Sequence, residues 1–175
     1  MRPHLWIIAG PNGSGKTTLT RRFISGKLPV VNPDDIAAAL NPGHPEAPEI
    51  AIRAGREALS MQRRLLASRQ SFALETTFSG NRELAVMREA KAAGYAVNLI
   101  FVSAGTAELS IFRIKTRTAS GGHHVPDDDV RRRYPRSYAN LEAGLVLADY
   151  AWILDNSGRH FSLSAFPSGV RRSGP

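Results

Sequence analysis

Residues 10–17 could bind phosphate. They read Gly-Pro-Asn-Gly-Ser-Gly-Lys-Thr and match the pattern G-x-x-x-x-G-K-[ST] at every fixed position. The glycines allow the backbone to curl, so that successive amide N–H groups converge on phosphate oxygens. We expect Lys16 to reach the β- and γ-phosphates and the Thr17 hydroxyl to ligate Mg²⁺. The motif therefore predicts ATP and Mg²⁺ as cofactors, bound by Gly10, Pro11, Asn12, Gly13, Ser14, Gly15, Lys16, Thr17 and Thr18.

A second set of residues carries carboxylates and hydroxyls that suit a phosphoryl acceptor. Asp34 and Asp35 follow the predicted strand 29–31, and Glu75 lies at the end of the predicted strand 71–76. A carboxylate near the γ-phosphate can guide the proton of an acceptor hydroxyl, and we assign this role to Asp34. The alternatives are N-capping of the next helix for the aspartates and an ordinary strand-end carboxylate for Glu75. The predicted substrate-binding residues are Asp34, Glu75, Thr76, Thr77, Ser79 and Arg82.

Basic residues are concentrated between positions 113 and 136. They are Arg113, Lys115, Arg117, Arg131, Arg132, Arg133 and Arg136. A lid of arginines can stabilise charge on a transferring phosphoryl group and expel water. We assign catalytic roles to Arg113, Arg117 and Arg132, beside Lys16 and Asp34. The alternative is a solvated basic face balanced by the aspartates at 127–129, and the adjacent His123 and His124 cannot form a metal pair on one helix face.

Elements of an α/β fold are needed to position these residues. Short apolar runs alternate with helical stretches, as in mostly parallel sheets. Strands are predicted at 5–9, 29–31, 71–76, 96–103 and 150–154, with a candidate edge strand at 160–166. Helices are predicted at 16–25, 35–40, 47–69, 80–93, 106–119 and 126–147, and helix 47–69 carries Ala51, Ala54, Ala58, Met61 and Leu65 on its apolar face. Ligands collect beyond the carboxyl ends of parallel strands, so Asn156 is a candidate contact of the nucleotide base, with a plain turn as the alternative.

The length of 175 residues predicts a single domain over 1–167 and a flexible tail over 168–175. The expected fold is a three-layer α/β/α P-loop NTPase with a mostly parallel five-stranded sheet and a helical, arginine-bearing lid at about 113–136. A hydrophobic content of 42% with 22% charged residues is typical of globular proteins, and the absence of cysteine excludes disulfide scaffolds and cysteine-ligated zinc. The apolar runs are too short to span a bilayer, so we expect a cytoplasmic protein without membrane contact.

The net charge of +8 favours an anionic partner. A GTPase switch is disfavoured because no Asn-Lys-x-Asp guanine signature is present. The alternative to a small-molecule kinase is a nucleic-acid end kinase or nucleic-acid-binding NTPase. Aromatic residues make up only 7% and are not interleaved with the arginines as a stacking platform requires, so a nucleic-acid partner is disfavoured.

Four blocks of the chain together resemble the zeta-toxin family of P-loop kinases, and more narrowly its short bacterial branch. They are the phosphate loop, residues 32–37, residues 74–79 and the stretch 121–137. The resemblance spans most of residues 4–157, and the ordered set of blocks is more specific than the phosphate loop alone.

The resemblance implies a bacterial kinase that transfers the γ-phosphoryl group of ATP to a hydroxyl of a small metabolite. In the characterised toxins the acceptor is UDP-N-acetylglucosamine, and an antitoxin protein is the partner. Asp34 falls at the family's base position and Glu75 at its acidic position. Arg113 or Arg117, with one of Arg131, Arg132 and Arg133, would match the family's lid arginines.

Overall fold

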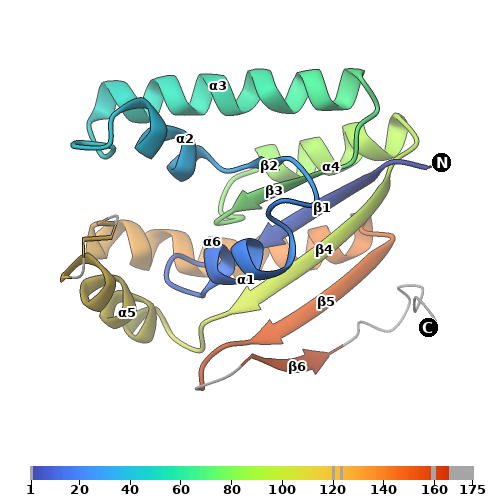
Figure 1. Cartoon of the computed structure of the whole chain (residues 1–175). Coiled ribbons are helices and arrows are strands. Elements are labelled where there is room, and N and C mark those ends of the chain that lie inside the picture. Colours follow the sequence, from blue (N-terminus) through green and yellow to red (C-terminus); the bar gives the residue numbers. More distant parts are fainter. Residues whose placement is uncertain (1, 120, 123, 159–160, 166–175) are drawn as a thin grey trace.

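The computed structural model describes residues 2–119, 121–122, 124–158 and 161–165. Within them, one sheet has the strand order β2-β3-β1-β4-β5-β6 (Figure 1). The strands are β1 (His4–Ala9), β2 (Val30–Val31), β3 (Phe72–Thr76), β4 (Ala96–Ser103), β5 (Tyr150–Asp155) and β6 (Ser162–Ala165). The first five are parallel, and β6 runs antiparallel to β5.

This arrangement confirms the predicted α/β P-loop NTPase fold with a mostly parallel sheet. The sheet has six strands where five were predicted, because the candidate edge strand at 160–166 does form: β6 pairs with β5 at the edge of the sheet. That segment is short and carries alternating serines, so its apolar signal is weak. The predicted tail, 168–175, lies outside the described residues.

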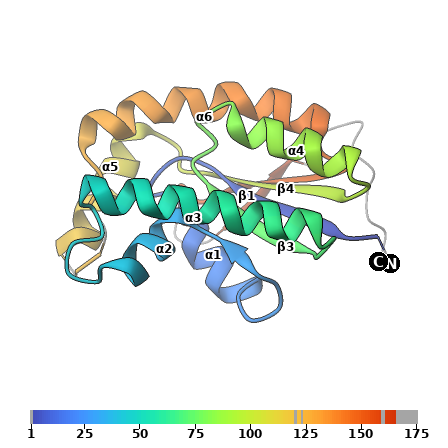
Figure 2. The same cartoon turned by 90° about the horizontal axis from the view of Figure 1, so that it is seen from above.

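Helices cover both faces of the sheet. They are α1 (Lys16–Phe23), α2 (Pro33–Leu40), α3 (Pro48–Ala67), α4 (Arg82–Ala92), α5 (Ala107–Ala119) and α6 (Asp127–Leu147). Figure 2 shows α4 and α6 on one side of the strands and α1 on the other. None of the helices in the described part of the chain combines the length and apolar character needed to cross a bilayer.

The core follows the alternation of side chains along the strands. In β1, Leu5 and Ile7 are buried in the large cluster formed with α3, α4 and α6, whereas Ile8 packs with Leu19 of α1 and with Val102 of β4. Burial on both faces explains why the strands are continuous apolar runs, as expected of a parallel sheet covered by helices.

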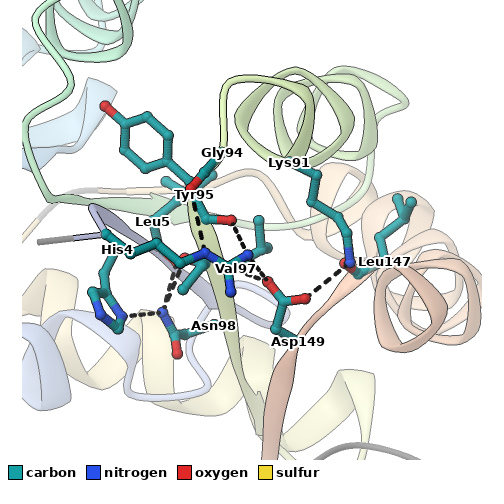
Figure 3. Close-up of polar contacts among 11 residues, drawn as sticks. His4, Leu5, Lys91, Gly94, Tyr95, Val97, Asn98, Leu147 and Asp149 are labelled. Atoms are coloured by element: carbon teal, nitrogen blue, oxygen red, sulfur yellow. Dashed lines mark hydrogen bonds and ion pairs between the residues drawn. The ribbon is translucent and has the colours of Figure 1, made fainter.

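A network of hydrogen bonds and ion pairs stabilises the end of the sheet opposite the carboxyl ends of the parallel strands (Figure 3). Asp149 accepts hydrogen bonds from the amide of Val97 at 2.9 Å and from Lys91 at 3.1 Å. Arg2 donates to the same carboxylate at 3.2 Å and to the carbonyl of Tyr95 at 2.7 Å. The network joins α4, the loop after α6 and the start of β4, and leaves the opposite edge of the sheet available for ligands.

Candidate active site

The carboxyl ends of β1, β3, β4 and β5 point to one edge of the sheet, beside α2, α5 and the start of α6 (Figure 1). A cavity of about 1120 Å³ lies there. Most of the predicted site residues line it: Asn12, Gly13, Gly15, Lys16, Thr17, Thr18, Asp34, Glu75, Thr76, Thr77, Arg82, Arg113, Arg117 and Asn156. The remaining predicted residues, Gly10, Pro11, Ser14, Ser79 and Arg132, are not part of the lining. The first three are buried within the loop itself.

The phosphate loop connects β1 to α1 and depends on its glycines. Gly13 has φ 71° and Gly15 has φ 97°, a region that residues with a side chain rarely adopt. A Cβ on Gly13 would lie 2.7 Å from the carbonyl oxygen of Ser110, and one on Gly15 would lie 2.5 Å from Nδ2 of Asn156. Since α1 begins at Lys16, its N-terminus and the loop amides face the cavity and suit an anion.

Lys16 is buried at the centre of the cavity, with only 8% of its surface exposed. Its Nζ donates a hydrogen bond of 2.7 Å to the carbonyl oxygen of Pro11. Burial lowers the pKa of Lys16 to about 8, the negative charges of Glu75 and Asp34 oppose that change, and the positive charge of Arg117 adds to it. Four predicted site residues are therefore close enough to interact electrostatically.

Glu75 lies against the hydroxyl that we expect to ligate magnesium. Thr17 Oγ1 donates to Glu75 Oε1 at 2.5 Å, and Oε2 of the same buried carboxylate has no hydrogen-bond partner within the described part of the chain. The register of β1 and β3 pairs Ile8 with Glu75 and so brings this carboxylate beside the loop. A hydroxyl and a carboxylate with a free oxygen are donors that a hard divalent cation accepts. These residues fit Mg²⁺, while the predicted contact of Glu75 with the acceptor stays a prediction.

Asn32, and neither aspartate, caps α2. Its Oδ1 accepts a hydrogen bond of 3.1 Å from the amide of Asp34, and its Nδ2 donates to Asp35 Oδ2 at 3.0 Å. The capping alternative for the aspartates was therefore wrong, since Pro33 begins the helix and both residues lie within its first turn. Both aspartates are exposed and line the cavity, and Asp35 also lies 3.6 Å from Arg21.

The hydroxyls after β3 are largely engaged within the loop that leads to α4. Thr76 Oγ1 donates to Glu83 Oε1 at 2.9 Å and accepts from the amide of Phe78 at 3.0 Å. Thr77 and Ser79 share a hydrogen bond of 2.9 Å between their hydroxyls. Thr76 and Thr77 still line the cavity, so these bonds fix the shape of its wall.

Arg113 and Asn156 line the cavity and are both bonded through the loop after β5. The guanidinium of Arg113 donates to the carbonyl oxygens of Ser157 and Gly158 at 3.5 and 3.4 Å. Asn156 Nδ2 donates to the carbonyl oxygen of Ser14 at 2.8 Å and so ties this loop to the phosphate loop. A contact of Asn156 with the nucleotide base stays a prediction.

The two basic clusters differ in what they present to the cavity. Arg117 of α5 and Arg133 of α6 are part of the lining. Arg132 points elsewhere and forms an ion pair of 2.6 Å with Asp129, and Arg131 lies 3.8 Å from Asp128. Arg133 also pairs with Asp129, at 2.8 Å. Of the three consecutive arginines, the helical phase of α6 turns only Arg133 toward the cavity.

Gln62 is a cavity residue that sequence reasoning missed. It lies in the buried stripe of α3 with Ala54, Ala58 and Leu65, and only 4% of it is exposed. It lines the cavity, and no hydrogen bond to its amide occurs among the described residues. A polar residue four positions after Ala58 in an otherwise apolar stripe was the signal that could have found it.

Comparison with known proteins matches residues 5–139 to a family model described as an AAA domain, AAA_33. An uncharacterised protein of Haemophilus influenzae is 34% identical over 141 residues, which cover 77% of this chain and 99% of that protein.

Among solved structures, one from the PezAT chromosomal toxin–antitoxin system of Streptococcus pneumoniae superposes with a TM-score of 0.69 at 18% identity, over 92% of this chain and 70% of that chain. The structure of AvrRxo1-ORF1:-ORF2 with ATP gives a TM-score of 0.60 at 17% identity, over 93% of this chain and 57% of that chain. At these identities the likeness shows a shared fold.

Proposed function

The chain belongs to the AAA domain family AAA_33, and from this premise we propose that it is an ATP-dependent kinase that phosphorylates a hydroxyl of a small molecule. The observation that carries this proposal is one cavity that joins a complete phosphate loop to a free carboxylate. Lys16 and the N-terminus of α1 form its centre, and Asp34 stands on the wall that α2 provides.

The triphosphate would be held by the loop amides, by Lys16 and by Arg117. Positioning and electrostatic stabilisation account for most of phosphoryl-transfer catalysis, and these are the effects that a buried lysine and a cavity-facing arginine supply. Thr17 and Glu75 would hold Mg²⁺, which when bound neutralises charge on the β- and γ-phosphates. Arg113 and Asn156 would contact the nucleoside.

The transfer itself needs a proton acceptor. The hydroxyl oxygen of the acceptor forms a bond to the γ-phosphorus while the bond from that phosphorus to the oxygen bridging the β- and γ-phosphates breaks, and ADP leaves. The hydroxyl proton passes to the Asp34 carboxylate. Arg117 and Arg133 face the cavity and stabilise the charge that spreads over the transferring group.

We carry the zeta-toxin resemblance forward as the finer assignment. Its support is the ordered set of four sequence blocks and the fold shared with the PezAT structure. The resemblance implies that the acceptor is a sugar-type hydroxyl, with UDP-N-acetylglucosamine as the example. It also implies an antitoxin as a protein partner. Expectations that also stay predictions are the single domain, the lid and the cytoplasmic location.

Transfer of label from γ-labelled ATP into a bacterial metabolite extract tests the proposal. We expect Lys16→Ala to abolish transfer, and Asp34→Asn to keep ATP binding while slowing transfer by about 10²–10⁴-fold, the usual contribution of a positioned base. Asp128→Asn is the control, because Asp128 is fully exposed near the start of α6, outside the cavity lining, and its loss should change activity little.

Two results would count against the proposal in different ways. Undiminished transfer by Asp34→Asn would remove the base assignment and leave the kinase. The absence of both labelled product and calorimetric heat with ATP would remove the kinase altogether.

A further inference from the structure

The cavity is divided by charge along the order of the strands. The name β2–β3 side stands for the lining residues that follow β2 and β3, together with those of α3. The name β4–β5 side stands for the lining residues of α5, of α6 and of the loop after β5. Figure 1 places α2 and α3 on the first and α5 on the second. The β4–β5 side carries the guanidinium groups of Arg113, Arg117 and Arg133.

The β2–β3 side is rich in carboxylates. Five of its lining residues are acidic: Asp34, Asp35, Glu46, Glu75 and Glu83. Two guanidinium groups stand nearby, and the one on Arg21 pairs with Asp35 at 3.6 Å. The other belongs to Arg82, which is exposed at the start of α4. An acceptor on this side therefore meets mainly hydrogen-bond acceptors with negative charge.

The amide of Gln62 on the same side is open to the cavity. Gln62 as a whole is 4% exposed, its amide makes no hydrogen bond among the described residues, and the amide atoms are not fully buried, so a ligand in the cavity can reach them. An amide carries both donor and acceptor atoms, and a hydroxyl group of a bound molecule can accept from or donate to it. The free oxygen of Glu75 is left to the Mg²⁺ proposed above.

The same wall also carries apolar side chains. Val31, Ala58, Leu74 and Val86 line the cavity between these polar groups. A sugar or cyclic polyol presents C–H faces and hydroxyl edges, and so fits a wall of this mixed character.

We infer, resting on the proposed kinase function, that the acceptor is an unphosphorylated polyhydroxylated molecule, a sugar or polyol whose hydroxyls are bound by Gln62 and the surrounding carboxylates. Phosphorylated acceptors, including nucleic-acid ends and the nucleotide sugar that the zeta-toxin resemblance brings, would place additional anions beside these carboxylates. This inference therefore keeps the sugar-type hydroxyl of that assignment and replaces its nucleotide part. Such like-charge contacts are an effective means of rejecting a ligand. If Arg82 offsets one of those anions, a phosphorylated acceptor is used and label enters the anionic fraction of an extract.

Charge fractionation of the acceptor tests this inference. A bacterial metabolite extract is separated on an anion-exchange resin, and each fraction is incubated with the full chain and γ-labelled ATP. We expect label to enter the unbound fraction, and periodate, which cleaves vicinal diols, to destroy the acceptor. Label confined to the resin-bound fraction, or a periodate-resistant acceptor, overturns the inference and leaves the kinase intact. Label in no fraction overturns the proposed function and this inference with it.

Substitution of the amide gives an independent test. Gln62→Leu should raise KM for the acceptor in the unbound fraction about tenfold, the effect of losing one or two neutral hydrogen bonds. Its melting temperature should stay equal or rise, because the amide has no partner to lose in the unliganded chain. Gln70→Leu, at an exposed position outside the cavity lining, is the matched control and should change neither value. An unchanged KM in Gln62→Leu, or a fall in its melting temperature, would refute the role of Gln62.

Discussion

Gly13→Ala separates the effect of backbone strain from the effect of close packing in the phosphate loop. Gly13 has φ 71°, and a Cβ there would lie 2.7 Å from the carbonyl oxygen of Ser110 and 3.3 Å from Ile114. Gly26 has a similar φ of 80°, but its Cβ would meet nothing within 4 Å. The two alanine variants therefore share the strain and differ in the collision.

The magnitudes follow from these contacts. A left-handed alanine costs about 1–2 kcal/mol, partly offset by the about 0.4–1 kcal/mol gained from a less flexible unfolded chain. Gly26→Ala should therefore lower the free energy of unfolding by about 1 kcal/mol. In Gly13→Ala, the backbone of α5 must also retreat, and such overpacking adds about 1–3 kcal/mol. We expect Gly13→Ala to lose about 2–4 kcal/mol in total.

Function should separate the two variants as well. Since α5 carries Arg113 and Arg117, its retreat moves both arginines relative to the loop, and we expect affinity for an ATP analogue to fall about tenfold or more in Gly13→Ala. Gly26→Ala should bind the analogue normally. Urea denaturation and titration calorimetry measure both quantities. Equal destabilisation of the two variants, or full affinity in Gly13→Ala, would refute the argument that contact between the loop and α5 requires glycine at this position.

Three further predictions concern protonation and buried polar groups. The pKa of Lys16 is about 8 in the free chain, so about half of the molecules carry a neutral Lys16 at pH 8, and a bound triphosphate should restore its positive charge. Calorimetry in buffers of different ionisation enthalpy should therefore find that binding takes up about half a proton at pH 8. The Lys16→Met variant should take up none. Burial raises the pKa of Asp149, but its hydrogen bonds and ion pairs outweigh burial and hold it below 3.8, so its stabilisation is present above about pH 4 and is lost as the pH falls through the folded pKa. Asp149→Asn should cost about 1–2 kcal/mol at pH 7 and little near pH 2 in urea melts, and an equal cost at both values would contradict this. Tyr95→Phe removes a buried hydroxyl that donates to the carbonyl oxygens of Leu65 and Gln70, at 2.9 and 3.0 Å, and should cost about 1–2 kcal/mol with an unchanged urea m-value.

The strands that build the site could be predicted because their apolar runs have sharp ends. Residues 96–103 were predicted as a strand and coincide with β4, and the predicted helix 106–119 differs from α5 by one residue. Burial on both faces makes each strand a continuous apolar run, and glycine or polar residues end it. The apolar pattern of an edge strand is weaker in the sequence, and the antiparallel strand β6 was therefore predicted least clearly.

The rotational phase of the helices was harder to predict than their extent. Of the residues predicted on the apolar face of helix 47–69, Ala54, Ala58 and Leu65 are buried and Met61 packs half-buried against the core, but Ala51 is exposed. Ile50 and Gln62, which were not predicted, complete the buried stripe of α3. Alanine occurs on both faces of this helix, so the apolar pattern does not define one orientation. Packing against β2 and α2 sets the phase, and it brings Gln62 to the cavity.

The same limitation affects the arginines. Positions 131–133 have equal chemistry in the sequence, and only the orientation of α6 distinguishes Arg133, which lines the cavity, from Arg132, which pairs with Asp129. At the start of α2, Asn32 competes with the aspartates for the N-cap position. Asn32 precedes Pro33 and takes the capping position, so the aspartates that follow fall within the helix.

Net charge predicts the partner of only one part of this cavity. The excess of +8 favoured an anion, and the guanidinium groups of α5 and α6 on the β4–β5 side are where an anion fits. The β2–β3 side carries the opposite charge, which a sum over the chain conceals. A kinase benefits from this division, because cations hold the triphosphate while a carboxylate beside them draws the proton from the attacking hydroxyl. A basic composition is therefore as compatible with an uncharged acceptor as with a nucleic acid, and the carboxylates after β2 and β3 favour the former.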